Sequence, residues 1–106
     1  MNDTTKTTID EVRAQQMLRV SEILKAIAHP VRLSILELLG SNKALTVSEV
    51  QSYTGIEQSL LSHHLIKMKD KGVLKSYREG KHHFYQLTDT HITQIFNCME
   101  NCSLIV

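Results

Sequence analysis

The sequence of 106 residues has little of several residue types on which special folds depend: it has no tryptophan, one proline (Pro30) and two cysteines (Cys98 and Cys102). Two cysteines four residues apart do not make a disulfide framework, so they matter as thiols. No apolar run approaches the roughly 20 residues that cross a bilayer, and residues 1–8 are polar, without the apolar segment of a signal peptide. We therefore expect a cytoplasmic protein with no membrane partner.

The residues that are present suffice for one domain with an aliphatic core. Hydrophobic residues make up 42% of the chain and aromatic residues 5%. A chain of this length buries roughly 60–70% of its unfolded surface, so neither a metal nor a disulfide is needed for folding. We expect a polar tail over residues 1–8 and a single domain over residues 9–106.

Positive charge is concentrated in one third of the chain, although the formal net charge is only +1. Residues 1–55 carry six basic and six acidic side chains, whereas residues 56–88 carry six basic against three acidic ones and four of the six histidines. Residues 89–106 have two acidic side chains and no lysine or arginine. The middle third is therefore the candidate for contact with an anion.

Capping residues and apolar spacing predict a mainly α-helical fold with one β-hairpin. Capping-box spacings at residues 8–11 and 46–49 mark the starts of two helices, Pro30 marks another start, and Gly40, Gly55 and Gly72 mark ends. The predicted helices cover residues 9–28, 30–40, 46–55, 57–71 and, after Thr88 and Asp89, a last helix to about residue 102. Residues 73–87 alternate in the manner of a two-stranded hairpin around Gly80.

The fourth predicted helix has two different faces. At about 100° per residue, Leu61, Leu65 and Met68 fall in one sector that must face the core. The opposite side carries Gln58, Ser59, Ser62, His63 and Ile66. Short polar side chains let a helix enter the major groove, and Gln and His reach base edges, although the same residues also suit an ordinary solvated surface.

A basic hairpin directly follows this helix and favours the nucleic-acid interpretation. Its tip residues Arg78, Lys81, His82 and His83 are expected beside the same helix, where they can meet phosphate. A helix-turn-helix followed by a charged hairpin is a winged helix.

Residues 26–90 resemble the ArsR/SmtB family of winged-helix repressors. The matching segments are AIAHPVRLSIL at 26–36, SHHL at 62–65, KGVL at 71–74, REGK at 78–81 and YQL at 85–87. The resemblance implies a homodimer held by the first and last helices, which binds a palindromic operator in double-stranded DNA and represses transcription until a ligand weakens binding.

Carried over by position, the resemblance assigns base reading and phosphate contact to seven residues: Gln58, Ser59, Ser62, His63, Lys67, Arg78 and Lys81. Glu57 and Ile66 depart from the family pattern and reduce the positive charge at the groove. Three further residues are expected to be structural or mixed in role: His64 is expected on the core side, His29 at a cap or turn, and Arg32 in either a structural or a phosphate-near position.

Two classes of effector are compatible with the sequence: a metal ion and a thiol reagent. Residues 45–50 lack the cysteines with which some family members bind thiophilic metals. Asp89 and His91 match half of another family metal site, and Cys102 lies eleven residues beyond His91, while Ile105 replaces the last ligand. On one continuous helix Cys102 could meet Asp89 and His91 of a partner chain and hold Zn(II) or Co(II).

Two alternatives remain for these residues. Asp89 is also a good N-cap, and buried cysteine often behaves as a small hydrophobe. Cys98 and Cys102 could instead form a thiol sensor, through disulfides between protomers or persulfide chemistry.

The rival to a repressor is a winged-helix module for protein interaction with little DNA affinity. No enzyme is predicted, because no glycine-rich phosphate loop occurs and Ser62–His63 lack an orienting acid.

Overall fold

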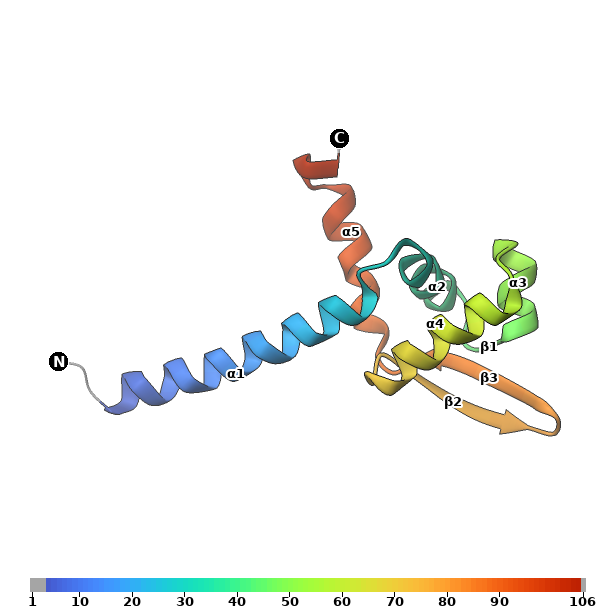
Figure 1. Ribbon diagram of the computed structural model, residues 1–106. Helices are drawn as coiled ribbons and strands as arrows, with labels where there is room; N and C mark the ends of the chain where they lie inside the picture. Colours follow the sequence, from blue (N-terminus) through green and yellow to red (C-terminus); the bar gives the residue numbers. More distant parts are fainter. Residues whose placement is uncertain (1–3, 106) are drawn as a thin grey trace.

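A computed structural model describes residues 4–105, which form five α-helices, a small antiparallel sheet and two 3₁₀ turns (Figure 1). The predicted class, mainly α with a two-stranded wing, is confirmed. No helix in this range is both long enough and apolar enough to cross a membrane. In chain order the elements are α1 (Thr4–Ile27), α2 (Pro30–Ser41), β1 (Leu45–Thr46), α3 (Val47–Thr54), α4 (Gln58–Asp70), β2 (Leu74–Glu79), β3 (His82–Leu87), η1 (Thr90–Thr93), α5 (Gln94–Glu100) and η2 (Ser103–Ile105).

The first helix begins earlier than the sequence predicts. The α1 helix starts at Thr4, so most of the expected polar tail is helical, and residues 1–3 lie outside the described residues. The expected start at residue 9 is wrong because residues 4–8 contain neither glycine nor proline, so nothing in them stops a helix from extending. Figure 1 shows α1 projecting away from the other helices.

The start of α2 is as predicted, but its end is not. His29 is the N-cap, its Nδ1 accepts from the Val31 N–H at 3.1 Å, and Pro30 occupies the first turn. Gly40 does not stop the helix, which runs to Ser41. A Cβ at Gly40 would lie 2.7 Å from Cγ2 of Thr93, so this glycine lets η1 pack closely against α2.

The helix-turn-helix formed by α3 and α4 follows its local signals. The Glu49 N–H donates to Oγ1 of Thr46 at 3.2 Å, and the Thr46 N–H donates to the Glu49 carboxylate at 2.9 Å, which confirms the capping box. Gly55 ends α3 with a φ of 72°, a conformation that favours glycine. Glu57 then caps α4 by accepting from the Ser59 N–H.

The wing belongs to a three-stranded sheet with the order β1-β3-β2. The hairpin turns at Gly80, whose φ of 65° suits the first position of a two-residue turn. The additional strand β1 has two residues and pairs Leu45 with Tyr85. A strand this short leaves no periodic signal, so sequence reasoning missed it.

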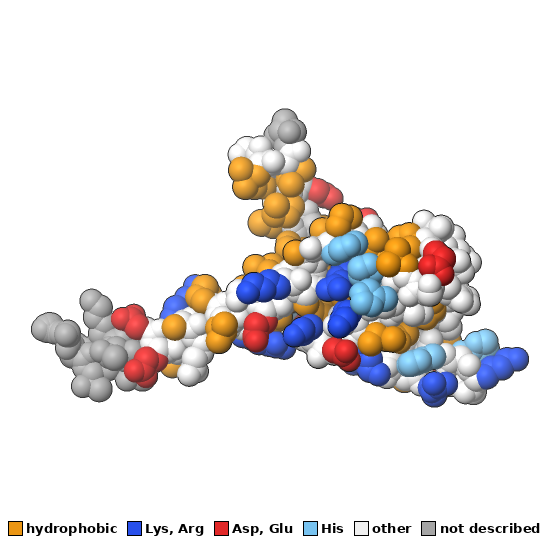
Figure 2. Space-filling view, in the orientation of Figure 1, with side chains coloured by type: hydrophobic (Ala, Val, Ile, Leu, Met, Phe, Trp, Pro, Cys, Tyr) orange, Lys and Arg blue, Asp and Glu red, His pale blue; other side chains and the backbone are white. Residues whose placement is uncertain are grey.

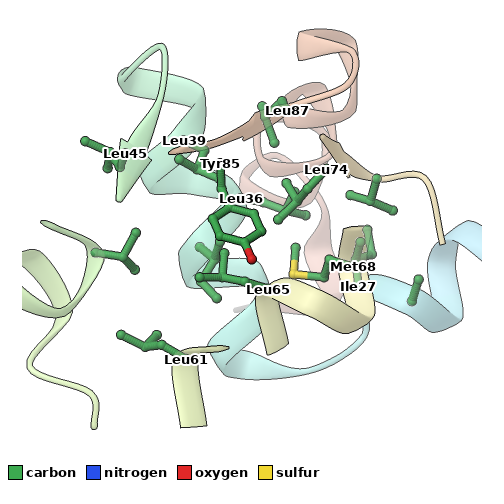
Figure 3. Close-up of a cluster of buried hydrophobic side chains, with 14 residues drawn as sticks. Ile27, Leu36, Leu39, Leu45, Leu61, Leu65, Met68, Leu74, Tyr85 and Leu87 are labelled. Atoms are coloured by element: carbon green, nitrogen blue, oxygen red, sulfur yellow. The ribbon is translucent and has the colours of Figure 1, made fainter. Parts of the chain in front are cut away.

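The core lies between α2, α4 and the base of the sheet (Figure 3). Leu61, Leu65 and Met68 of α4 are fully buried there, as the angular arithmetic predicted. They meet Leu36 of α2 and the Tyr85 ring of β3 in one apolar cluster. Because this face of α4 is anchored in the core, its opposite face is held toward solvent.

The predicted continuous last helix is wrong. The segment starts as a 3₁₀ turn capped by Asp89, becomes α-helical over Gln94–Glu100 and ends before Cys102. The Asn101 side chain donates to the Asn97 carbonyl at 2.8 Å, and the Cys102 N–H donates to the Met99 carbonyl at 3.0 Å. Asparagine side chains compete in this way with helix propagation.

Candidate nucleic-acid interface

The exposed face of α4 carries the predicted base-reading residues. Gln58, Ser59, His63 and Lys67 are exposed, and Ser62 is half-buried. Ile66 shares this face and is 48% exposed. Since α4 is anchored on its other side, these side chains are presented on a rigid helix.

Two of these side chains are already held by hydrogen bonds within the protein. The Gln58 Nε2 donates to Oγ of Ser48 at 2.9 Å, which fixes the amide against the start of α3. The Ser59 hydroxyl donates to the Glu57 carboxylate at 2.7 Å, and this bond, with that from the Ser59 N–H, lowers the Glu57 pKa. Glu57 therefore stays ionised and keeps a negative charge at the start of α4, the predicted base-reading helix (the reading helix below). Sequence reasoning did not find Ser48, because its role depends on the angle between α3 and α4.

The two histidines at the centre of α4 point in different directions. His63 is exposed, whereas His64 is 4% exposed and lies on the core side, as predicted. Arg32 donates from Nε to Nδ1 of His64 at 3.0 Å and from Nη1 to the Ala26 carbonyl at 2.9 Å. Of its two predicted roles, Arg32 has the structural one.

The register of the hairpin divides its tip residues between two faces. Arg78 pairs with His83, on the side of the buried Tyr85 ring and of α4. Desolvation lowers the His83 pKa, with smaller contributions from Arg78 and from Lys69 of α4, so this face is close to the reading helix. Lys81 lies in the exposed turn.

The other wing face is aromatic. Tyr77 and Phe84 stack with their centroids 5.2 Å apart, and His82 meets Phe84 edge-on at 6.3 Å. The expectation that His82 lies beside α4 is therefore wrong, because adjacent residues of a strand point to opposite faces. Figure 2 shows the lysine, arginine and histidine side chains gathered along the middle of the visible face and at the wing tip.

The candidate effector residues are only partly brought together within one chain. Asp89 Oδ1 accepts from the His91 N–H at 2.9 Å and lies 2.7 Å from His91 Nδ1. These two bonds lower the Asp89 pKa. Among the described residues of one chain, no three His, Cys, Asp or Glu side chains are grouped so as to hold an ion.

The two cysteines do not share the one continuous last helix that the sequence predicts. Cys98 is exposed on α5, and the half-buried Cys102 lies beyond the end of that helix. His91, in η1, and Cys102 are therefore not on one continuous helix, contrary to the prediction. Both thiols are free.

Comparison with known proteins places this geometry in a family. The family model for bacterial regulatory proteins of the arsR family matches residues 29–76, which include α2, α3 and α4. The transcriptional repressor PagR of Bacillus anthracis is 37% identical over 79 residues, which are 74% of this chain and 79% of PagR. The chain belongs to the ArsR family. This ArsR-family protein is a DNA-binding transcriptional repressor and not an enzyme, which confirms the predicted function at this level.

Solved structures agree with the winged-helix fold of this ArsR-family protein. The crystal structure of PagR superposes with a TM-score of 0.73 at 34% identity, over 81% of this chain and 98% of PagR. The homodimeric winged helix-turn-helix domain of Mb0332 from Mycobacterium bovis superposes with a TM-score of 0.71 at 26% identity, over 83% of this chain and 81% of that domain. A cadmium resistance regulatory protein, the CadC homolog of Staphylococcus aureus, is 29% identical over 85 residues, 80% of this chain and 70% of that protein.

Proposed function

We propose that this ArsR-family repressor binds a palindromic operator as a homodimer, with α4 in the major groove and the wing on the flanking backbone. The observation that carries this proposal is the α4 surface, which is anchored on one side and polar and exposed on the other. Gln58, Ser59, Ser62 and His63 contact bases. Contacts to phosphate come from Lys67, Arg78 and Lys81. Residues 9–106 act as one DNA-binding and dimerisation domain in the cytoplasm, where the DNA partner lies.

Homodimerisation through α1 and α5 is supported by the apolar surface that these helices expose. Val12, Leu18 and Leu24 of α1 are 51%, 63% and 46% exposed. An apolar groove of about 340 Å³ runs between α1, α2 and α5, and Leu24, Phe96 and Met99 are among its lining residues. Figure 2 shows apolar side chains along α1 and on the projecting C-terminal helix. A second copy of the chain would cover this surface.

The shape of the chain also supports a dimer. Its radius of gyration is 17.2 Å, and its extents are 60 × 38 × 21 Å. A compact domain of about 100 residues has a radius of gyration near 13 Å. Much of the difference comes from α1, which projects from the rest of the chain and, among its residues 10–27, buries only Ala26 and Ile27. A long helix of this kind is stable in water when a partner buries its apolar side.

For the effector, we propose a metal ion bound across the dimer by Asp89, His91 and Cys102, with Zn(II) or Co(II) as the candidate ions. Carboxylate, imidazole and thiolate ligands suit both ions. The name of the Staphylococcus aureus relative, a cadmium resistance regulator, supports a metal as the class of effector. The Asp89–His91 contact orients the imidazole through Nδ1, so Nε2 of this exposed side chain would be the ligand atom.

The second effector candidate is a thiol reagent acting on Cys98 and Cys102. Its support is that both thiols are free and neither is fully buried. The two residues flank the end of α5, so a change at either thiol would act on the proposed dimer contact.

Fluorescence anisotropy tests the DNA-binding proposal. The probe is a labelled duplex from the region upstream of the protein's own gene, compared with a shuffled duplex of equal composition at several salt concentrations. We expect tight, salt-dependent binding with a preference for the upstream duplex, because several phosphate contacts per dimer release counterions. Equal affinity for the two duplexes, or an affinity independent of salt, would favour the protein-interaction module instead.

A further inference from the structure

A buried polar contact joins the reading helix to the end of α1. His64 is the buried polar side chain among the described residues, and it lies next to the apolar cluster of α4. Arg32 of α2 donates from Nε to its Nδ1 at 3.0 Å. The same guanidinium donates from Nη1 to the carbonyl of Ala26, in the last turn of α1, at 2.9 Å. One side chain therefore connects α1, α2 and α4.

His29 packs against the His64 ring. The two ring centroids are 4.4 Å apart. His29 is fixed in turn, because its Nδ1 caps α2 by accepting from the Val31 N–H. The His64 ring thus contacts both a cap residue and a guanidinium, and His63 meets it edge-on at 5.4 Å.

The contact between Arg32 and His64 requires a neutral imidazole. A guanidinium has only donors and is always charged, so Nδ1 of His64 must keep its lone pair and the ring proton must be on Nε2. A second proton would go to Nδ1. It would replace the acceptor by a donor that faces a cation, and the hydrogen bond would be lost.

The surroundings of His64 disfavour a positive charge. Burial lowers the His64 pKa, and the neighbouring His29, Arg32 and His63 lower it further. The groove beside Arg32 is lined by Glu22 and Lys25 of α1 and by Lys67 and Lys71 at the end of α4. Three of these four side chains are lysines, and Glu22 is the single carboxylate among them.

We propose that Arg32 and His64 are positioning residues for DNA binding: neutral His64 fixes the angle of α4 relative to α1, and protonation of His64 releases α4. This inference rests on the proposed reading role of α4. In the dimer, α1 sets the distance between the two reading helices, so a link from α1 to α4 controls whether both helices fit one operator. Acidification therefore weakens operator binding.

The sign of the pH effect on DNA affinity distinguishes this mechanism from the titration of other histidines. Protonation of exposed histidines on the DNA-facing surface adds positive charge and strengthens binding to DNA. Protonation of His64 weakens it. The variant His64→Asn keeps an acceptor, the amide Oδ1, near the position of Nδ1 and does not titrate. His82→Asn, on the aromatic wing face, is the matched control for loss of one histidine.

The test measures operator affinity by anisotropy at constant ionic strength from about pH 7.5 to about pH 4.5, a range that extends well below the ordinary pKa of histidine because the pKa of His64 is lowered. On acidification, wild type and His82→Asn should lose roughly tenfold or more in affinity, the size of one hydrogen bond to a charged group. His64→Asn should bind at neutral pH and lose little. Circular dichroism at each pH shows that the fold is retained. A pH profile of His64→Asn that matches wild type overturns the proposal.

Two further measurements keep the test independent of how well His64→Asn folds. Long-range ¹⁵N–¹H NMR of the free wild-type protein should show His64 protonated on Nε2, and a proton on Nδ1 at neutral pH overturns the proposal. Arg32→Lys keeps the charge but has one nitrogen in place of the two that contact His64 and Ala26. This variant should therefore lose operator affinity while the dimer persists. Wild type without operator preference at neutral pH contradicts the proposed function itself, whereas preference with an unchanged pH profile in His64→Asn contradicts only the positioning role.

Discussion

At the residue scale, neighbouring side chains of α4 have separate roles because a helix turns by about 100° per residue. His63 and His64 are adjacent in the chain, yet one is exposed and the other is 4% exposed. The same separation holds in the wing, where Arg78 faces α4 and Tyr77 faces away. Residue type alone does not distinguish a base contact from a structural contact at these positions.

The assignment of base contacts and phosphate contacts predicts different effects of substitution. Ser62→Ala or His63→Ala should lower the discrimination between operator and random DNA by about 1–3 kcal/mol, because a base contact is lost. Lys81→Ala should weaken binding to both DNAs about equally, because a phosphate contact carries no sequence information. Anisotropy with the two duplexes measures both quantities. The same pattern for all three variants would refute the reading role of α4.

Stability should fall in mild acid because two histidines have lowered pKa values. The pKa values of His64 and His83 are both lowered, mainly by desolvation. The unfolded chain therefore takes up these protons at a higher pH than the folded chain. Below about pH 6.5 the unfolded state binds more protons, and the free energy of unfolding decreases. Urea unfolding at several pH values measures this decrease, which should be smaller in His64→Asn; a midpoint that stays constant down to about pH 5.5 would contradict it.

At the scale of elements, the close contact between α2 and η1 depends on the absence of a side chain at Gly40. In an open helix, Gly→Ala stabilises by roughly 0.5–1 kcal/mol. Here the added Cβ would lie 2.7 Å from Cγ2 of Thr93. We therefore predict that Gly40→Ala destabilises the protein by about 1–3 kcal/mol, the usual cost of overpacking.

A double-mutant cycle tests whether Thr93 is the cause. Thr93→Ser removes Cγ2 and keeps the hydroxyl, which donates to the Thr90 carbonyl at 2.7 Å. Gly40→Ala should be tolerated in the Thr93→Ser background, as measured by thermal or urea unfolding. An equal loss of stability in both backgrounds would place the strain elsewhere.

The proposed metal ligands lie in the last segment of the chain, from Asp89 to Cys102, and they predict a response of DNA binding to metal. Titration of the operator complex with Zn(II) or Co(II) should lower DNA affinity if Asp89, His91 and Cys102 bind the ion, and Cys102→Ser should remove the effect. The visible absorption spectrum of bound Co(II) also depends on which atoms bind it, so it tests for a thiolate ligand. Cys98→Ser is the matched control for the metal test and should keep the response to the ion. A persulfide donor tests the thiol alternative, in which Cys98→Ser and Cys102→Ser should both lose the response. If a metal lowers DNA affinity equally in wild type and Cys102→Ser, this ligand set is wrong.

At the scale of the whole molecule, α1 and α5 expose apolar surface that one chain does not cover. Leu18→Glu would place a charge on this surface, so we predict a monomeric protein with operator affinity reduced by at least about a hundredfold, since two half-sites are no longer bound together. Analytical ultracentrifugation measures the mass. Tyr53→Ser, at an exposed position on α3, is the control and should remain dimeric. A dimeric Leu18→Glu protein would exclude α1 as the interface.

The sequence by itself determined the elements whose signals are local. The capping box at Thr46 and Glu49, Pro30 at the start of α2, Gly55 after α3 and the apolar side of α4 all act within one or two helical turns, and each is observed. The charged hairpin after α4 was also predicted, since alternation and turn residues specify it. These features, in this order, predicted the winged-helix fold and favoured DNA as the partner.

Only the tertiary structure decided what depends on contacts between distant residues. The link between Arg32 and His64 spans 32 positions, and the role of Gly40 depends on Thr93. The pairing of β1 with β3 and the face of each wing residue depend on strand register. The break after Glu100 separates Cys102 from the helix on which the effector hypothesis placed it. Local patterns set backbone conformation, whereas packing between elements sets which side chains meet, because that energy comes from residues that adjoin only after folding.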